Sequence, residues 1–279
     1  MYKSGWRMSC KVCVDSIRKW RGDARIAAIM ILAFLFEWIL IADLRHLCDE
    51  YQLSFSCWFF VFLFKGIQAM FHFFGILLLF CDAPFVDKQQ MDVILRVGKK
   101  NWFRGKILYI ITASLLYFLY LFFISIAAFW PNVGFTLKWG ELISVLSAQH
   151  NSVLRRDIVA YYTPLEAFGV QFMVCMMFAV FLGLLIFYMN LFKYKNLGAG
   201  IACTLILTGG ISGLNTLNGS RLIVYFVPMM WTDIELYIKD SGGIPLAYAV
   251  TLLGIGIMVL IGLIIRKSKK YNIECQSEM

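Results

Sequence analysis

Four polar side chains that could carry a proton or line a transport path lie within the first two hydrophobic runs of the chain: Glu37, Lys65, Gln68 and His72. The last three are spaced by three and four positions, which places them on one face of a helix. Glu37 and Lys65 lie at matching depths, and an unpaired charge in lipid is costly, so we expect these two to pair. A packed ion pair and a translocation path or proton relay are both compatible with this pattern.

Other reactive side chains do not assemble into a catalytic or metal-binding set. The residues GISG at 210–213 resemble the nucleophile motif of rhomboid intramembrane proteases, but that chemistry needs a histidine base after the serine. All three histidines precede Ser212, so we expect Ser212 and the glycines of this motif to serve close helix–helix packing instead. Cys10 and Cys13 form half of a zinc or redox motif, and the sequence has no second half. We expect no catalytic residue and no metal site on this chain.

The composition is that of a membrane protein. Of 279 residues, 61% are hydrophobic and 15% are charged, whereas soluble domains have about 25% charged residues. Six hydrophobic runs occupy residues 26–43, 57–80, 107–130, 169–192, 197–215 and 244–265. Each is close to or above the roughly 18 to 20 residues with which a helix crosses a bilayer. We therefore expect an all-α, polytopic membrane protein in which residues 1–279 form one domain with six transmembrane helices.

Basic residues are distributed unevenly between the segments that connect these runs. Nineteen lysines and arginines lie in four segments, namely 1–25, 81–106, 193–196 and 266–279. Six lie in the alternate segments 44–56, 131–168 and 216–243. Because cytoplasmic segments are enriched in lysine and arginine, both termini are expected in the cytoplasm. This asymmetry accounts for most of the +9 net charge, so we expect no nucleic-acid partner.

Residues 3–22 are predicted to form an amphipathic helix. Its apolar stripe keeps the spacing of three and four that marks one helix face: Trp6, Cys10, Cys13, Ile17 and Trp20. With a tryptophan at each end and basic residues beside the stripe, the helix is expected to lie in the inner interface, in contact with membrane lipids. Packing on the chain's own loops is the alternative.

Residues 81–106 contain a second short amphipathic helix. Asp82 and Pro84 are a helix-start signal, and Gly98 is a stop signal. The apolar face and the first basic residues after it are Met91, Ile94, Leu95, Lys99 and Lys100. Docking on a partner protein and lying flat on lipid are both compatible with this helix.

Two further segments are expected on the outer side. Residues 131–168 are too long for a hairpin turn and end in an aromatic stretch suited to the outer membrane surface. Residues 216–243 include a short apolar stretch broken by Pro228, which is expected to form a re-entrant element before the last span. Cys48 and Cys57 are also expected on this side, as free thiols or as one disulfide.

This layout resembles the permease subunits of ABC transporters of the type-2 exporter family. The likeness covers the whole chain through its architecture, with six spans, an interfacial helix at 3–22, a cytoplasmic helix at 83–98 and a re-entrant element at 216–243. The stretch DAPFVDKQQMDVILRVGKKNWFRGKI is similar to the same region in permeases of Gram-positive bacteria. The segment 131–168 is longer than in many members of this family.

The resemblance implies a transport subunit of the bacterial plasma membrane, not an enzyme by itself, that pairs with a second copy or a related permease. Cytoplasmic ABC ATPase subunits would bind ATP and Mg²⁺, since this chain has no cofactor of its own and no G-x-x-x-x-G-K-[ST] phosphate loop. The helix at 83–98 would couple to the ATPase. It would use Phe85, Met91, Ile94 and Leu95 to enter a groove, and Arg96, Lys99 and Lys100 to set orientation.

The alternative function is that of a non-transporting scaffold or sensor subunit whose basic loop 81–106 binds anionic lipid or a regulator. An intramembrane enzyme would need a catalytic set that this sequence does not complete. No motif in the sequence specifies a transported substrate.

Overall fold

The computed structural model is mostly helical. It describes residues 5–51, 53–83, 88–140, 143–144, 156–192, 197–215, 222–238 and 243–268. Four described helices are long and apolar enough to cross a membrane: α2 (Ala24–Tyr51), α5 (Lys99–Ala128), α8 (Pro164–Asn190) and α11 (Leu246–Ser268). Two shorter apolar helices, α3 (Gly66–Phe80) and α9 (Leu197–Asn215), pack against each other and against α8. This is the architecture of an all-α membrane protein, with four candidate spans where the sequence predicted six.

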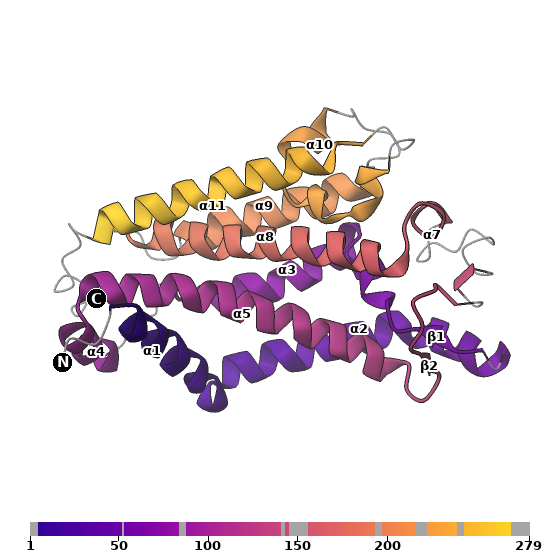
Figure 1. Cartoon of the computed structure of the whole chain (residues 1–279), viewed down its shortest axis with the longest axis horizontal. Coiled ribbons are helices and arrows are strands. Elements are labelled where there is room, and N and C mark those ends of the chain that lie inside the picture. The colour runs from indigo at the N-terminus through magenta and orange to yellow at the C-terminus, as the bar shows by residue number, and fades with distance from the viewer. Residues whose placement is uncertain are drawn as a thin grey trace.

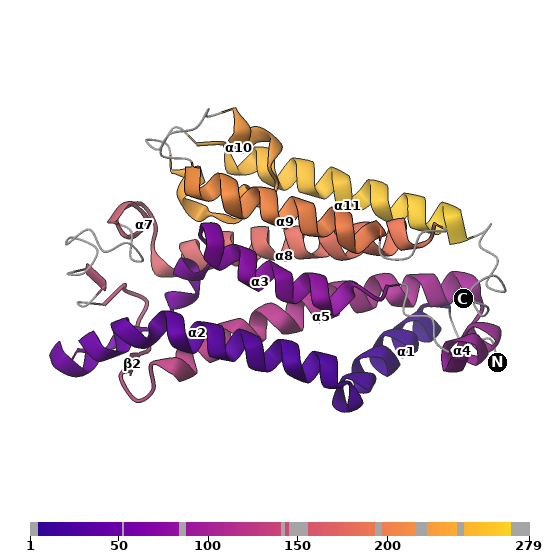
Figure 2. The same cartoon turned by 180° about the vertical axis from the view of Figure 1, so that it is seen from behind.

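The helices form a bundle in which the chain runs back and forth along one long axis (Figure 1). α2, α5 and α9 run away from the end that carries α1 (Gly5–Arg18) and α4 (Lys88–Val97), whereas α3, α8 and α11 return toward it (Figures 1 and 2). We call this end the α4 end. The opposite end, called the far end, carries β1 (Phe55–Ser56), β2 (Val133–Gly134) and α7 (Arg156–Tyr161).

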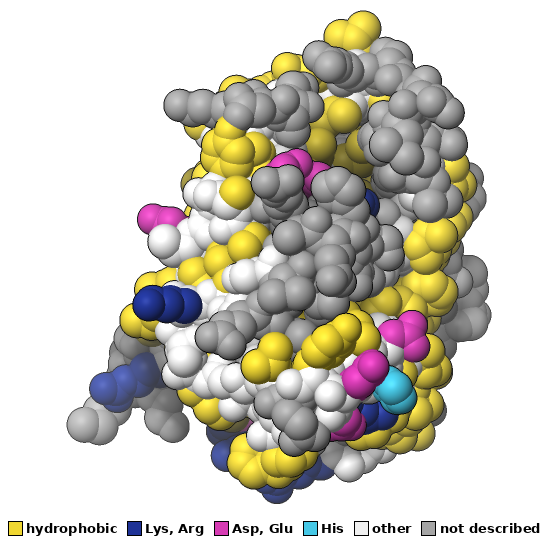
Figure 3. Space-filling model, turned by 90° about the vertical axis from the view of Figure 1, so that its right-hand side faces the viewer, with side chains coloured by type: hydrophobic (Ala, Val, Ile, Leu, Met, Phe, Trp, Pro, Cys, Tyr) yellow, Lys and Arg dark blue, Asp and Glu magenta, His cyan; other side chains and the backbone are white. Residues whose placement is uncertain are grey.

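α2 continues beyond the predicted run 26–43, to Tyr51. Its 28 residues are about 42 Å long at 1.5 Å per residue, whereas the hydrocarbon core of a bilayer is about 30 Å thick. The last turns carry exposed His46, Asp49 and Glu50. Figure 3 looks onto the far end, where acidic, basic and histidine side chains lie among hydrophobic ones. α2 is therefore long enough for its polar C-terminal turns to extend past the hydrocarbon core of a bilayer.

The second predicted span, 57–80, is not one helix. Phe59–Leu63 form a 3-10 turn, η2, and α3 begins only at Gly66, whose φ of +47° lies in the left-handed region. All residues of η2 are buried, because the turn packs against both α5 and α8 and places Phe60 beside Phe122. A continuous helix would turn part of this aromatic run toward lipid. The prediction of a continuous span here is wrong, because the break buries every one of these side chains.

α1 packs along the first half of α5. The two helices approach closely at Gly105, where an added Cβ would lie 2.6 Å from the Cβ of Val12. Next to this contact, the Ser9 hydroxyl donates a hydrogen bond to the carbonyl of Asn101, at 3.0 Å. Small residues mediate close helix contacts in membranes in this way, so packing requires the glycine at 105.

The buried face of α1 differs from the predicted apolar stripe. Its buried residues are Ser9, Val12, Cys13 and Ser16. Trp6, which begins the predicted stripe, is 62% exposed. Trp20, in the turn η1 (Lys19–Gly22), donates from Nε1 to the hydroxyl of Tyr109 on α5, at 3.0 Å. The N-terminal helix therefore packs on α5, a candidate span of its own chain, and leaves Trp6 exposed.

Residues 222–238 cap the far ends of α8 and α9. They form α10 (Ile223–Phe226) and the turns η3 (Met230–Thr232) and η4 (Ile234–Tyr237). Gln171 of α8 donates from Nε2 to the carbonyl of Thr232 at 2.6 Å, and Met229 lies against Gly209 of α9. The described part of the predicted re-entrant element thus forms short turns on neighbouring helices and does not form a re-entrant helix pair.

A short parallel strand pair joins two segments of the far end, a feature that the all-α prediction omitted. β1 pairs with β2 in a register that places Phe55 opposite Val133. The ring of Phe55 stacks on Phe129, with 4.2 Å between ring centroids. Cys48 and Cys57, whose pairing the sequence left open, are both buried free thiols.

The contact at Gly105 predicts opposite effects for two matched substitutions. Gly105→Ala places a methyl group against Val12 and should lower the free energy of unfolding by about 1–3 kcal/mol, the usual cost of overpacking. Gly262→Ala in α11 meets no atom within 4 Å and should be neutral or stabilising, because alanine favours helix by about 1 kcal/mol over glycine. Thermal unfolding in detergent measures both, and equal midpoints for the two variants would contradict the close contact.

Candidate functional site

α4 has two adjacent apolar side chains in very different environments. Ile94 is 4% exposed, whereas Leu95 is 83% exposed. Arg96, Lys99 and Lys100 are exposed as well. Consecutive helix residues point about 100° apart, so the side of α4 that packs on α1 and α5 takes Ile94 and leaves Leu95 outside. Leu95 is therefore an exposed apolar side chain with exposed Asp92 and Arg96 on the same helix, and with exposed Lys99 and Lys100 at the start of α5.

The predicted coupling residues are only partly brought together. Phe85 lies outside the described residues, as does the side chain of Met91, although Met91 belongs to α4. The expectation that Ile94 enters a groove on a partner is wrong, because this side chain is buried within its own chain. The cause is Gly98, whose φ of +82° ends α4 immediately before α5 begins and leaves no linker between the two helices.

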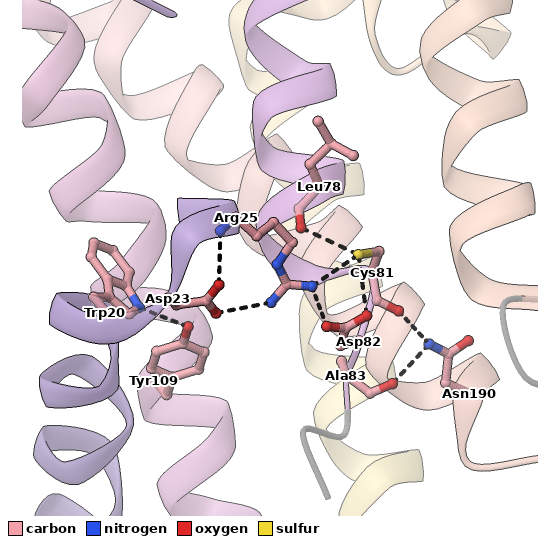
Figure 4. A network of polar contacts seen from close by, with 9 residues as sticks. All are labelled: Trp20, Asp23, Arg25, Leu78, Cys81, Asp82, Ala83, Tyr109 and Asn190. Atoms are coloured by element: carbon pink, nitrogen blue, oxygen red, sulfur yellow. Dashed lines mark hydrogen bonds and ion pairs between the residues drawn. The ribbon is translucent and has the colours of Figure 1, made fainter. Parts of the chain in front are cut away.

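Residues 81–83, which directly follow α3, are fastened by a polar network, drawn in Figure 4. Arg25, in the first turn of α2, forms ion pairs with Asp82 and with Asp23, the latter at 3.6 Å. The Arg25 guanidinium also donates to the sulfur of Cys81, at 3.3 Å. Exposed ion pairs contribute little to stability by themselves. Their effect here is positional, because they fix the place where the chain leaves α3.

Asn190, the last residue of α8, is the buried part of this network. Its Nδ2 donates to the carbonyls of Cys81 and Ala83, at 3.1 Å and 2.7 Å. Its Oδ1 accepts from the backbone N–H of Gly198, at 3.0 Å, at the start of α9. One side chain therefore satisfies three backbone groups of two separate segments. We call Arg25, Asp82 and Asn190 the clasp.

Sequence analysis missed the clasp. It treated Asp82 as the start of the helix that follows, whereas Asp82 pairs with Arg25 and α4 begins at Lys88. A signal for Asn190 was present, since it is a polar side chain near the end of the apolar run 169–192. Two of its three partners, the carbonyls of Cys81 and Ala83, could not be identified, because they lie more than a hundred residues earlier in the chain.

The environment of Cys81 makes its thiol a useful reporter on the clasp. Burial raises the pKa of the Cys81 thiol, and so does the Asp82 carboxylate, while Arg25 acts in the opposite direction. The thiolate is the form that reacts with alkylating reagents. Cys81 should therefore react slowly at neutral pH while the clasp is intact.

The polar residues of the first two runs are separated by the break before α3. Glu37 is fully buried in α2, and both of its carboxyl oxygens lack a hydrogen-bond partner among the described residues. Lys65 is exposed at the start of α3, next to Gly66, and forms no ion pair with Glu37. The predicted pair is therefore not formed. The helix is interrupted at Lys65, whose backbone is extended, so Lys65 does not continue the helix face that carries His72. Gln68 is half-buried and His72 is buried.

Within the described parts of the chain, no group of three or more histidine, cysteine, aspartate or glutamate residues is arranged to hold a metal ion. No protein-family model, curated protein or solved structure matches the chain.

Replacing Asn190 tests the clasp. Asn190→Ala leaves the carbonyls of Cys81 and Ala83 and the N–H of Gly198 without their partner, and each buried polar group left unpaired costs about 1–3 kcal/mol. The free energy of unfolding should fall by about 2 kcal/mol or more, and Cys81 should be alkylated faster, as measured by mass spectrometry of the labelled site.

The matched control is Thr204→Ala, which removes an exposed hydroxyl bonded to the Ile201 carbonyl of its own helix. This change should alter the free energy of unfolding by less than about 0.5 kcal/mol. Unchanged stability and unchanged Cys81 labelling in Asn190→Ala would show that the clasp does not hold the start of the α4 segment.

Proposed function

We propose that the chain is the membrane-spanning permease subunit of an ATP-driven exporter and that α4 is its docking element for a separate ATPase subunit. The observation that carries this proposal is the 83% exposure of Leu95 on a helix that buries Ile94 beside it. An apolar anchor on an amphipathic helix, accompanied by basic residues, suits insertion into a groove of a partner protein. Arg96, Lys99 and Lys100 would then set the orientation of the contact.

The connections of α4 support a role in coupling. At its start, the clasp ties the preceding segment to α2, α8 and α9. At its end, Gly98 leads directly into α5, which runs the length of the bundle. A force applied at Leu95 would therefore reach the membrane-spanning helices without passing through a long linker.

The architecture of the proposed subunit follows the exporter resemblance. α3 and α9 would complete six passes with the four long helices, placing both termini on the cytoplasmic side of a bacterial plasma membrane. A second copy or a related permease would complete the path. ATP and Mg²⁺ would be bound by the ATPase subunits.

The test is a leucine substitution at each end of the bundle. Leu95→Glu should abolish co-purification of the ATPase and ATP-dependent transport without preventing membrane insertion, because a buried leucine contributes about 1.5–3 kcal/mol to such a contact and a buried carboxylate opposes it. Leu137→Glu alters a leucine that is 70% exposed beyond β2 and should leave both readouts unchanged. Full transport activity in Leu95→Glu would overturn the proposal.

The same experiment separates the scaffold or sensor function. Leu95 with three exposed basic residues also suits a surface of anionic lipid. If no ATPase co-purifies under mild conditions and Leu95→Glu lowers binding of the soluble peptide 88–106 to phosphatidylserine vesicles, the lipid-binding function replaces the transport function.

A further inference from the structure

Three buried polar side chains on α2, α3 and α5 have polar atoms without a hydrogen-bond partner among the described residues. They are Glu37 at Oε1 and Oε2, His72 at Nε2 and Ser114 at Oγ, and all three residues are at most 1% exposed. A buried polar group without a hydrogen bond costs about 1–3 kcal/mol, and proteins satisfy nearly all such groups. Unpaired groups on three adjoining helices therefore require an explanation.

Glu37 and His72 belong to the same junction. The ring of Phe36, the neighbour of Glu37, packs edge-on against the imidazole of His72, with 5.4 Å between ring centroids. The Tyr117 hydroxyl of α5 donates to the backbone carbonyl of His72, at 3.0 Å. The Glu37 carboxyl is close enough to act electrostatically on that same hydroxyl. α2, α3 and α5 thus bring an acid, an imidazole and a phenol together inside the bundle.

Among the described residues, no lysine, arginine or histidine forms a salt bridge with Glu37. From α5, the hydroxyls of Tyr117 and Tyr120 lie near Glu37. From α3, the titratable group in the junction is His72, whose ring packs against Phe36. The Tyr120 hydroxyl donates to the carbonyl of Met30, at 2.8 Å, so it does not hydrogen-bond to the acid. The rings of Phe36 and Phe71 pack against each other between α2 and α3, with 4.6 Å between their centroids.

An ionised carboxylate in this position would be a bare charge in an apolar interior, which is far more costly than a neutral acid. The carboxyl avoids that cost by keeping its proton. We propose that Glu37 is a proton-binding site of this bundle, holding a proton while α2, α3 and α5 are packed together.

The proton is that of the neutral Glu37 acid. Its loss would leave a carboxylate in a packed junction that excludes the water it needs, so protonation of Glu37 favours the closed bundle. This inference does not rest on α4 binding an ATPase.

Infrared spectroscopy of the purified full chain in lipid nanodiscs tests the site. At neutral pH the wild type should show the carbonyl stretch of a protonated carboxylic acid, and Glu37→Gln should abolish this band. Glu50→Gln, an exposed glutamate on the same helix, should leave it unchanged. A spectrum in which Glu37→Gln removes no protonated-acid band would show that Glu37 is ionised and would overturn the proposal.

Discussion

The structure depends on how closely other helices can approach α5. Helices in lipid gain little from the hydrophobic effect when they associate, so close van der Waals contact has to hold them together. Gly105 lets α1 reach the backbone of α5, and Gly183 lets α8 approach so near that an added Cβ would lie 2.6 Å from Ile110. With these two contacts made, α5 becomes a fixed centre for α2, α3, α4 and η2, all of which also pack on it.

The two proposals concern the same helices. α2 carries the clasp residue Arg25 in its first turn and buries Glu37 further along. α3 buries His72 and is followed by Cys81, to which Arg25 donates a hydrogen bond. Whatever moves the start of the α4 segment therefore acts on the pair of helices that enclose the acid and the imidazole. The proposed docking at α4 and the proposed protonation of Glu37 therefore involve the same helices.

The sequence predicted what depends on local composition. Hydropathy located the four long helices to within a few residues at most ends, and the exposed Leu95 with its basic neighbours was singled out. Prediction from sequence failed where a segment can occupy either of two apolar environments. The hydrophobic run 57–80 is equally compatible with packing between helices and with facing lipid, so nothing in its composition reveals the break at Gly66. The pairing of Lys65 failed with it, and Asn190 was missed because its partners are distant in sequence.

The packing of α1 on α5 has a consequence for biosynthesis. Ser9 and its partner Asn101 are 92 residues apart, and chains are synthesised at about 5 to 20 residues per second, so α1 emerges about 5 to 18 s before its docking surface exists. During that interval an amphipathic helix with tryptophans near both ends is suited to wait at the membrane surface. The apolar stripe that begins at Trp6 is only partly buried in the folded bundle, and in the nascent chain it would contact the membrane surface.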